Sequence, residues 1–363
     1  MPQTPLTGAV RRLARRVDWY IVALFGAIGV AALVPAEREA AEAVSWLTRI
    51  AIGLLFFLYG ARLSPQAALD GVRHWRLHLP VLALTFAAFP LLGLAAELLP
   101  DRVLGAELTA GVLFLAVLPS TVQSSIAFTS LARGNVAAAL CSASFSTVLG
   151  VLLTPLLAVA LIGAGEDGGI PVGLGQLGDI AVQLLLPFLA GQAVRRWISD
   201  WLGRHRTLIG LCDRGSILLV VYAAFSRGMA TGIWQRVSPG RLALLGVLAA
   251  LLLGAALLLA DRSARLLRLP REDRVTALFC GATKSLASGL PMASVLFPAD
   301  EVAMTVLPLM LYHTLQLVVC AALARRLSRT REPAPSAPTS APPPAPAAST
   351  PAPPPTPPRT GRR

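Results

Sequence analysis

The sequence has few charged residues and almost no lysine. Only 14% of its 363 residues are Asp, Glu, Lys or Arg, against about 25% in ordinary soluble domains, whereas 55% are hydrophobic. This composition argues against an average soluble enzyme. Of the 32 cationic residues, 31 are arginine, and the single lysine is Lys284. The net charge of +13 raises nucleic acid as a partner, but the placement of the arginines along the chain explains the charge without one.

Cysteine and histidine are also scarce, with four residues of each. The cysteines fall in apolar segments without any CxxC spacing, which is typical of small buried hydrophobic residues. His74 and His78 have a spacing that suits a metal pair, but the Arg and Trp residues around them favour an anchor at a membrane interface. The sequence therefore predicts neither a disulfide framework nor a transition-metal cofactor.

Long apolar runs make up most of the chain. A membrane-spanning helix needs about 20 mostly apolar residues, and runs of that length that are rich in Leu, Ala and Gly favour helices over strands. We therefore predict an all-α integral membrane protein with ten transmembrane helices. Their ranges are about 18–34, 44–62, 78–99, 105–131, 135–162, 176–197, 212–230, 239–260, 274–298 and 301–324.

The arginines are distributed unevenly between the two sides of these spans. With an even number of spans both termini share one side, which carries 25 arginines against six on the other. When the acidic residues are included, the two sides carry +17 and −5. Short basic loops stay in the cytoplasm during insertion, so we place both termini in the cytoplasm and the chain in the cell (inner or plasma) membrane. Arg227, Arg236 and Arg241, between spans seven and eight, are the exception.

The composition divides the chain into four parts. Residues 1–17 form a basic cytoplasmic N-terminus, and residues 331–363 are rich in proline and alanine. A segment of that composition cannot bury a core, so we expect a disordered cytoplasmic tail. Between these ends lie two five-span halves, 18–162 and 176–326.

The fourth and ninth spans each contain helix breakers and polar residues near the middle. Because these spans hold the same position in the two halves, they favour an inverted-repeat transporter, in which half-helix ends frame a site at the membrane midplane. The candidate substrate- or ion-binding residues are Lys284, Thr283, Ser285, Pro119, Thr121, Gln123, Ser124 and Ser125. In the fifth span, Ser144 and Thr147 share a helix face and could point at the first break, or they could simply allow close helix packing.

Lys284 lies deep in the ninth span, where a cation costs at least ~2.5–3.5 kcal/mol on insertion scales. Lysine is a compact point charge, unlike the arginine used everywhere else in this chain. Three functional interpretations follow: an anion-binding group, a proton-coupled switch, or a tethered cation that stands where a sodium ion would bind. The structural alternative is a buried ion pair, for which no carboxylate lies near the middle of any span.

Several segments together resemble one transporter family. They are Arg133-Gly134-Asn135-Val136, Leu153-Thr154-Pro155, the broken span after Pro119, and Thr283-Lys284-Ser285-Leu286 followed by Gly289-Leu290-Pro291-Met292. The family is the bile acid:sodium symporter family, and the resemblance is greatest to its divergent branch in bacteria and animals. It implies two inverted five-helix repeats, with a panel formed by spans one, two, six and seven. The other six spans form a core in which the broken helices cross.

The resemblance also implies where a sodium ion would bind. In sodium-coupled members the ligands come from the fourth-span break, a fifth-span Ser/Thr pair, and an acid and an amide in the ninth span. The corresponding candidates for Na⁺ here are Ser124, Ser125, Ser144 and Thr147. Aligned on Gly281, however, the acid falls at Phe279 and the amide at Thr283, next to Lys284. A hard cation prefers carboxylate oxygens, so the ninth span departs from the family's sodium chemistry.

We therefore predict a secondary active transporter, not an enzyme, that moves a small organic anion through the bilayer by alternating access. The resemblance suggests sodium as the coupling ion, and proton coupling through Lys284 is the competing hypothesis. The alternative from another class is a non-transporting membrane regulator that retains the fold. No nucleic-acid partner is expected, and no cofactor other than Na⁺.

Overall fold

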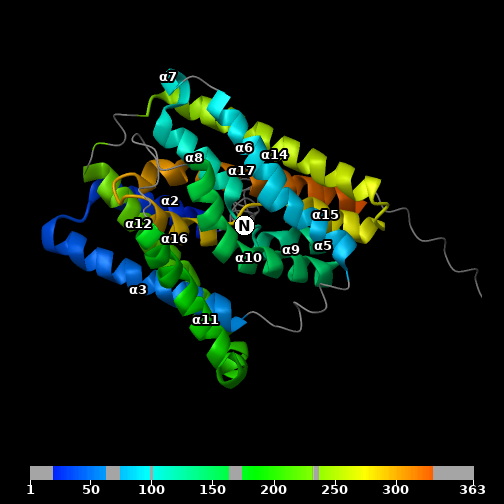
Figure 1. Ribbon diagram of the computed structural model, residues 1–363, viewed down its shortest axis with the longest axis horizontal. Helices are drawn as coiled ribbons and strands as arrows, with labels where there is room; N and C mark the ends of the chain where they lie inside the picture. Colours follow the sequence, from blue (N-terminus) through cyan, green and yellow to red (C-terminus); the bar gives the residue numbers. More distant parts are fainter. Residues whose placement is uncertain are drawn as a thin grey trace, which may run out of the picture.

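The computed structural model describes residues 19–62, 74–98, 101–162, 174–230, 232 and 237–329 (Figure 1). Within these ranges the chain forms helices and no strands. The predicted N-terminal segment 1–17 and the predicted tail 331–363 lie outside the described residues.

The first half of the chain ends in a long helix that follows several shorter ones. Its elements are α2 (Trp19–Leu33), α3 (Arg38–Arg62), α5 (Trp75–Ala83), the π-helical turn η1 (Leu84–Ala88), α6 (Phe89–Leu94), η2 (Ala95–Leu98), α7 (Asp101–Leu104), α8 (Ala106–Val117), α9 (Gln123–Leu131) and α10 (Val136–Ile162). The second half comprises α11 (Leu174–Arg204), α12 (Arg206–Ala230), α14 (Pro239–Leu266), α15 (Arg271–Ala282), α16 (Leu286–Leu296) and α17 (Val302–Arg329).

Each predicted span falls on one helix or on a series of short helices. The fourth span is α8 followed by α9, and the ninth is α15 followed by α16, so both predicted breaks are present. Six stretches are long and apolar enough to cross a membrane, and they lie on α3, α5 to α6, α10, α12, α14 and α17. These helices support a multi-pass membrane protein, whereas the ten crossings and the inverted repeat stay predictions.

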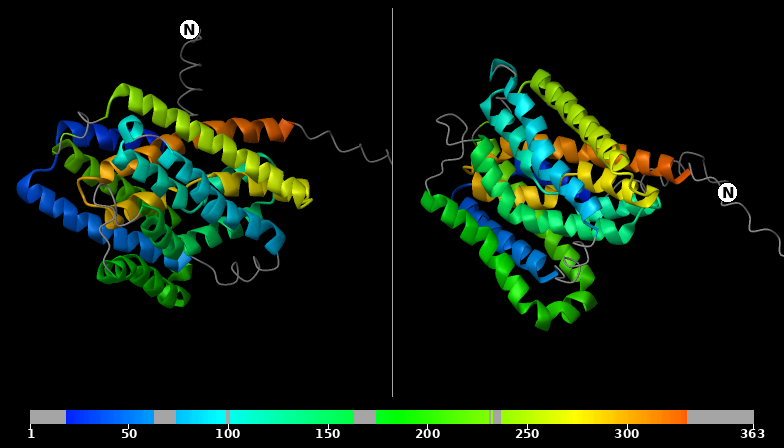
Figure 2. Two further views of the ribbon diagram at one scale, coloured as in Figure 1. Left: turned by 45° about the horizontal axis from the view of Figure 1, so that its top comes forward. Right: turned by 45° about the vertical axis from the view of Figure 1, so that its right-hand side comes forward.

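The helices pack in two groups (Figure 1). In one group, α3 packs extensively against α11 and α12, and α2 against α12. In the other, α8 packs against α17, and α14 packs against α15 and α17, which run beside it in Figure 2. The broken helices α8–α9 and α15–α16 belong to the second group, and α16 also contacts α11 and α12 of the first.

Two glycines bring α3 and α11 into backbone contact. A Cβ atom on Gly60 would overlap the carbonyl oxygen of Phe188, and one on Gly191 would overlap that of Phe57. Small residues at such reciprocal positions let membrane helices approach closely and gain dispersion energy. This crossing therefore depends on the absence of a side chain at both positions.

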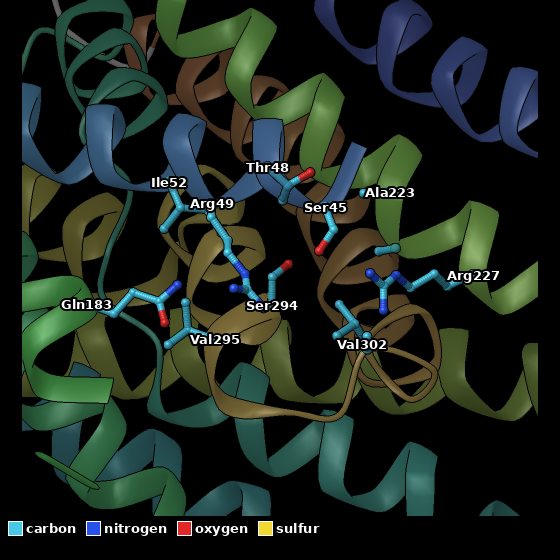
Figure 3. Close-up of a pocket in the computed structure, with 12 residues that line it drawn as sticks. Ser45, Thr48, Arg49, Ile52, Gln183, Ala223, Arg227, Ser294, Val295 and Val302 are labelled. Atoms are coloured by element: carbon cyan, nitrogen blue, oxygen red, sulfur yellow. The ribbon is translucent and has the colours of Figure 1, made fainter. Parts of the chain in front are cut away.

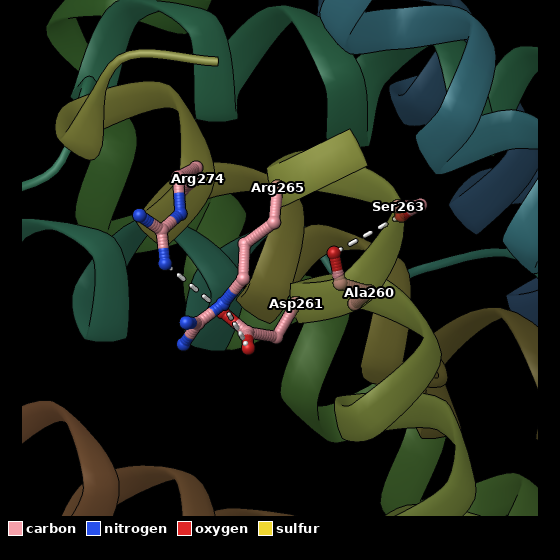
Figure 4. A network of polar contacts seen from close by, with 5 residues as sticks. All are labelled: Ala260, Asp261, Ser263, Arg265 and Arg274. Atoms are coloured by element: carbon pink, nitrogen blue, oxygen red, sulfur yellow. Dashed lines mark hydrogen bonds and ion pairs between the residues drawn. The ribbon is translucent and has the colours of Figure 1, made fainter. Parts of the chain in front are cut away.

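The second group of helices is tied together at one end by polar contacts. Asn135 caps α10 by accepting from Ala138 N (3.0 Å), and it donates to the Asp273 carboxylate in the first turn of α15 (2.9 Å). Nearby, Asp261 of α14 pairs with Arg265 (2.7 Å) and Arg274 (3.3 Å), as Figure 4 shows. The Asn135 segment of the family resemblance thus joins the start of α10 to the start of α15.

One expectation about the histidines is wrong. His78 was expected to anchor the third span at the interface, but its side chain is only 5% exposed, and its Nδ1 lies 2.6 Å from the hydroxyl of Ser142. The Arg and Trp residues next to His78 in the sequence could not show that α10 packs against this face of α5. The four cysteines lie in described helices and none forms a disulfide.

Alanine substitutions of matched glycines test the α3–α11 crossing. In Gly191→Ala the new methyl group would displace the Phe57 backbone, so we expect a loss of about 2 kcal/mol, typical of overpacking. In Gly210→Ala no atom lies within 4 Å of the new Cβ, so stability should be unchanged or rise by up to about 1 kcal/mol. Thermal unfolding of the purified protein in detergent measures both, and equal effects at the two positions would contradict the crossing.

Candidate functional site

The two helix breaks cross and bond to each other. Residues 118–122 separate α8 from α9, and residues 283–285 separate α15 from α16. The amide of Ser285 donates to the carbonyl of Pro119 at 2.9 Å. The Thr283 hydroxyl gives its one hydrogen to Phe279 O, so the hydroxyl of Ser125, 2.7 Å away, donates to it. Four of the predicted site residues, Pro119, Ser125, Thr283 and Ser285, therefore meet at the crossing.

Side chains of α10 complete the hydrogen bonding of the first break. Proline at 119 provides no amide hydrogen for a helical bond, and α8 ends just before it, at Val117. The Val117 carbonyl accepts from the Thr154 hydroxyl (2.9 Å), and the Ser120 amide donates to the Ser146 hydroxyl (2.8 Å). An unpaired backbone group costs several kcal/mol away from water. These two hydroxyls pair with the backbone groups of the break and so remove that cost inside a membrane.

Lys284 binds the carbonyl end of α8. Its side chain is fully buried, and its Nζ donates to the carbonyl oxygens of Ala116 (2.7 Å), Leu118 (2.7 Å) and Thr85 (3.0 Å). The Nζ atom also lies 4.0 Å from the centre of the Phe89 ring, a cation–π distance. Among the described residues, the partners of this charge are therefore backbone dipoles and an aromatic face, and no carboxylate takes part.

The hydrogen-bond partners of the Lys284 Nζ atom indicate which protonation state of the amine fits this site. An ammonium has three hydrogens and no lone pair, and three carbonyl oxygens surround it. A neutral amine would direct a lone pair at one of these oxygens. The C-terminal end of α8 also carries the negative end of its helix dipole, which favours a cation. The geometry thus suits the charged form of Lys284.

The Thr85 carbonyl is available because of a π-helical turn. In η1 the amide of Phe89 bonds to the carbonyl of Leu84, five residues earlier. The next donor in this register would be residue 90, which is proline and has no amide hydrogen. A break in the third span therefore supplies the third ligand of Lys284, and π-bulges are frequent at such functional positions.

Two residues of α17 hold the second break, and neither is among the predicted site residues. Gln316 accepts from the amide of Lys284 (2.8 Å) and donates to its carbonyl (2.9 Å), so its side-chain amide replaces two backbone partners. The Tyr312 hydroxyl donates to the Ala282 carbonyl (2.6 Å). Gln316 is the one carboxamide in α17, and this is the signal that could have identified it.

A cavity of about 300 Å³ lies beside the crossing, between the breaks and helices α2, α3, α10, α11 and α12; we call it the Asp213 cavity. The predicted site residues that line it are Thr121, Gln123, Ser144, Thr147 and Ser285. Lys284 and Thr283 are buried behind this surface, and neither lines it. The cavity is therefore bordered by the first residues of α9 and α16.

The charged residues of the Asp213 cavity come from α3 and α12. Arg62 forms an ion pair with Asp213, and Arg214 lines the same cavity. The N-terminal ends of α9 and α16 also face it, through Gln123 and Ser288. Helix N-termini carry partial positive charge, so the cavity combines two guanidinium groups with two positive dipole ends.

The predicted sodium ligands differ in their bonding. The hydroxyl of Thr147 donates to its own helix at Ala143 O (2.9 Å), and that of Ser125 is engaged with Thr283. The Ser124 hydroxyl is buried and has no hydrogen-bond partner within the described part of the chain. Across the same residues, no group of three or more Asp, Glu, His or Cys side chains could hold a metal.

A second cavity, of about 470 Å³, lies between α3, α11, α12 and α16; we call it the Arg227 cavity (Figure 3). Arg49 of α3 and Arg227 of α12 line it, and in Figure 3 the guanidinium group of Arg49 lies beside Ser294, whereas that of Arg227 lies toward Val302. The helix pair α3 and α12 therefore borders a cavity near each of its ends.

Comparison with known proteins identifies relatives along nearly the whole chain. Residues 18–329 match the model of the SBF-like CPA transporter family (DUF4137). The uncharacterized protein PA2026 of Pseudomonas aeruginosa is 52% identical over 90% of this chain and 97% of its own length. The Escherichia coli protein named "Putative symporter YfeH" is 45% identical over 88% of this chain and 96% of its own. Sodium/bile acid cotransporter 7 of Rattus norvegicus is 28% identical over 85% and 92%.

Removal of the Gln316 amide tests how the second break is held. In Gln316→Leu the amide and carbonyl of Lys284 lose their partners in a fully buried site, so we expect a loss of about 1–3 kcal/mol. The matched control is Gln183→Leu in α11, where the side chain is exposed and little change is expected. Thermal unfolding compares the two variants, and equal midpoints would show that Gln316 does not support the break.

Proposed function

Because the chain belongs to the SBF-like CPA transporter family, we propose that it is a secondary active transporter that moves a small organic anion across the cell membrane by alternating access. The observation that carries this proposal is the pair of crossed helix breaks beside the Asp213 cavity. Broken helices of this kind expose half-helix ends to a solute at the midplane.

We assign the helices to ten spans in two inverted repeats. The broken spans are α8–α9 and α15–α16, the panel is α2, α3, α11 and α12, and the core is formed by the other spans. The extensive packing inside each group and the lighter contacts between them support this division. Movement of core against panel would then open the space beside α3 and α12 to each side in turn, with both termini in the cytoplasm.

The anionic character of the solute is supported by charge around the Asp213 cavity. Arg62 and Arg214 line it, and one carboxylate, Asp213, is already paired with Arg62. The N-terminal ends of α9 and α16 add two positive dipole ends on the core side. An anion between core and panel would contact both parts, as alternating access requires.

In this proposal Lys284 is a tethered cation that replaces a bound ion inside the core. Its ammonium neutralises the carbonyl end of α8, which a mobile cation would otherwise have to bind. Because the amine is attached to the break between α15 and α16, it also links the two broken helices. Lys284 would therefore stabilise the helix breaks that border the anion site, although its own side chain does not line the cavity.

Sodium is the coupling ion that we propose, with Ser124, Ser125, Ser144 and Thr147 as its candidate ligands. The relative named sodium/bile acid cotransporter 7 supports sodium, and the unpartnered hydroxyl of Ser124 is available to it. Proton coupling through Lys284 is disfavoured, because loss of a proton would direct a lone pair at one of three carbonyl oxygens.

Chemical rescue of a lysine deletion tests the tethered cation. Lys284→Ala leaves a space lined by three carbonyl oxygens and the Phe89 ring, so we expect a lower melting temperature. Methylammonium should bind there and restore part of the loss, because ligand binding to the native state raises stability by mass action. The wild-type protein should not respond to methylammonium.

The matched control is Lys284→Met, which fills the same space without a charge. It should stay destabilised in the presence of methylammonium. If Lys284→Met were as stable as the wild type, or if the alanine variant ignored methylammonium, Lys284 would be a packing residue and the tethered-cation role would be wrong.

Transport and its coupling are tested in two steps. A panel of organic anions, cations and neutral solutes is first screened for those that raise the melting temperature, and anions should predominate. Uptake of a stabilising anion into proteoliposomes is then measured with sodium and proton gradients imposed separately. We expect the sodium gradient to drive uptake. A response to the proton gradient alone would replace sodium with proton coupling, and a protein stabilised by no solute would favour a membrane regulator.

A further inference from the structure

The turn between α11 and α12 lies beyond the apolar part of both helices. α11 has 31 residues and is roughly 46 Å long at 1.5 Å per residue. A membrane helix tilted by 40°, near the upper limit of observed tilts, would still extend about 36 Å along the membrane normal, against about 30 Å of hydrocarbon core. The end of α11 at Arg204 and the start of α12 at Arg206, at the lower edge of the helices in Figure 1, therefore reach the depth of the lipid headgroups.

The end of α11 has one packed face and one exposed face. Ile198 and Leu202 pack in a cluster with Leu58 and Ala61 of α3 and with Ile209 of α12. The exposed residues at this end of the hairpin, which we call the hairpin surface, are Arg196, Trp197, Asp200, Trp201, Arg204 and Arg206. Because the packed face fixes the helix ends against each other, the hairpin surface has a defined arrangement.

The hairpin surface is positively charged. Arg196, Arg204 and Arg206 are exposed, and so is Asp200, the one acidic residue between positions 195 and 206. Three arginines and one carboxylate leave a net charge of +2 on the surface. The Nε atom of Arg204 donates to the backbone carbonyl of Asp200 at 3.3 Å, which keeps this guanidinium beside the helix end. The surface is therefore complementary to an anion even with its acid counted.

Two tryptophans are exposed beside these charges. The side chains of Trp197 and Trp201 are 65% and 45% exposed. The guanidinium carbon of Arg196 lies 4.0 Å from the centre of the Trp197 ring, and Trp201 stacks on His205 at 4.5 Å between ring centres. A guanidinium stacked on a ring still directs its hydrogens outward in its own plane. The surface thus combines apolar rings with hydrogen-bond donors.

Resting on the topology of the proposed function, which puts this turn in the cytoplasm, we propose that the hairpin surface binds an anionic phospholipid of the cytoplasmic leaflet, with Arg196, Arg204 and Arg206 as its headgroup-binding residues. Guanidinium groups bind phosphate oxygens through paired hydrogen bonds, and basic residues next to membrane helices attract anionic headgroups. The rings of Trp197 and Trp201 suit the boundary between headgroups and acyl chains.

The bound lipid would connect the bilayer to the proposed panel. α11 and α12 are two of its four helices, and α11 packs extensively against α3, a third. A headgroup held by arginines from both α11 and α12 would keep the ends of these helices at one depth in the membrane. The lipid is therefore a structural partner of the panel and is distinct from the transported solute.

The test compares lipids that differ in headgroup charge. Phosphatidylglycerol and phosphatidylcholine with identical acyl chains are added in a concentration series to the purified full-length protein in a neutral detergent, and the melting temperature is recorded. We expect phosphatidylglycerol to stabilise the protein and phosphatidylcholine to bind at least about fivefold more weakly. Glycerol 3-phosphate, which carries the phosphate without acyl chains, should have no effect at the same concentrations. Added salt should reduce the difference between the two lipids.

Two triple variants assign the binding to the hairpin surface. The combination of Arg196→Gln, Arg204→Gln and Arg206→Gln should weaken phosphatidylglycerol binding about tenfold or more and abolish its advantage over phosphatidylcholine. The matched control replaces three exposed arginines at the end of α17, a helix that contains no tryptophan, by Arg325→Gln, Arg326→Gln and Arg329→Gln. It removes the same charge and should change the affinity less than about twofold. The melting temperature of each variant without added lipid controls for folding.

A second pair of variants tests the aromatic contribution. Trp197→Ala removes the ring that supports Arg196 and should weaken phosphatidylglycerol binding about threefold or more, because the guanidinium loses its position and the lipid an apolar contact. Trp75→Ala removes a ring of similar exposure, 61%, at the start of α5 and should leave the affinity unchanged.

Three results would overturn the inference. They are equal affinities for the two lipids, equal losses in the two triple variants, and stabilisation by glycerol 3-phosphate as strong as that by phosphatidylglycerol, which would indicate a site for a soluble phosphate. The proposed function fails separately. If no ion gradient drives solute uptake but lipid binding depends on the three arginines, the hairpin surface stands and the transporter does not. If uptake is observed and the arginines do not affect lipid binding, the transporter stands alone.

Discussion

The structure depends on one interaction, the contact of a buried ammonium with the carbonyl end of a broken helix. The α8 helix ends at Val117 inside an apolar surrounding, where the carbonyl oxygens of residues 116–119 need hydrogen-bond donors from the protein itself. Lys284 donates to two of them, and Thr154 and Ser285 donate to two others. Because Lys284 lies in the break between α15 and α16, a residue of the second broken helix donates hydrogen bonds to the carbonyl end of the first.

This arrangement joins three parts of the chain that are far apart in sequence. The π-helical turn before Pro90 provides a carbonyl from the third span, α8 provides two, and Gln316 of α17 holds the backbone of Lys284. A change in any one of these elements leaves a buried polar group without a partner. Such a network favours one rigid arrangement of the helices that it joins.

Much of this could be predicted from the sequence, because it depends on local composition. Apolar length predicts membrane helices, Pro119 and Gly281 predict the two breaks, and the position of Lys284 in an apolar run predicts a buried charge. The partners of Lys284 could not be predicted, because backbone carbonyls leave no trace in the residue types that carry them. The same holds for Gln316, whose role follows from the packing of α17 against the crossing, and for the pairing of Arg62 with Asp213.

The charge of Lys284 can be measured directly, since the chain contains one lysine and selective ¹⁵Nζ-lysine labelling gives one side-chain signal. We expect an ammonium resonance coupled to three hydrogens at neutral pH, with slow hydrogen exchange because all three hydrogens are bonded in a fully buried site. A neutral amine resonance, or an ammonium whose hydrogens exchange as rapidly as those of a solvent-exposed lysine, would contradict it.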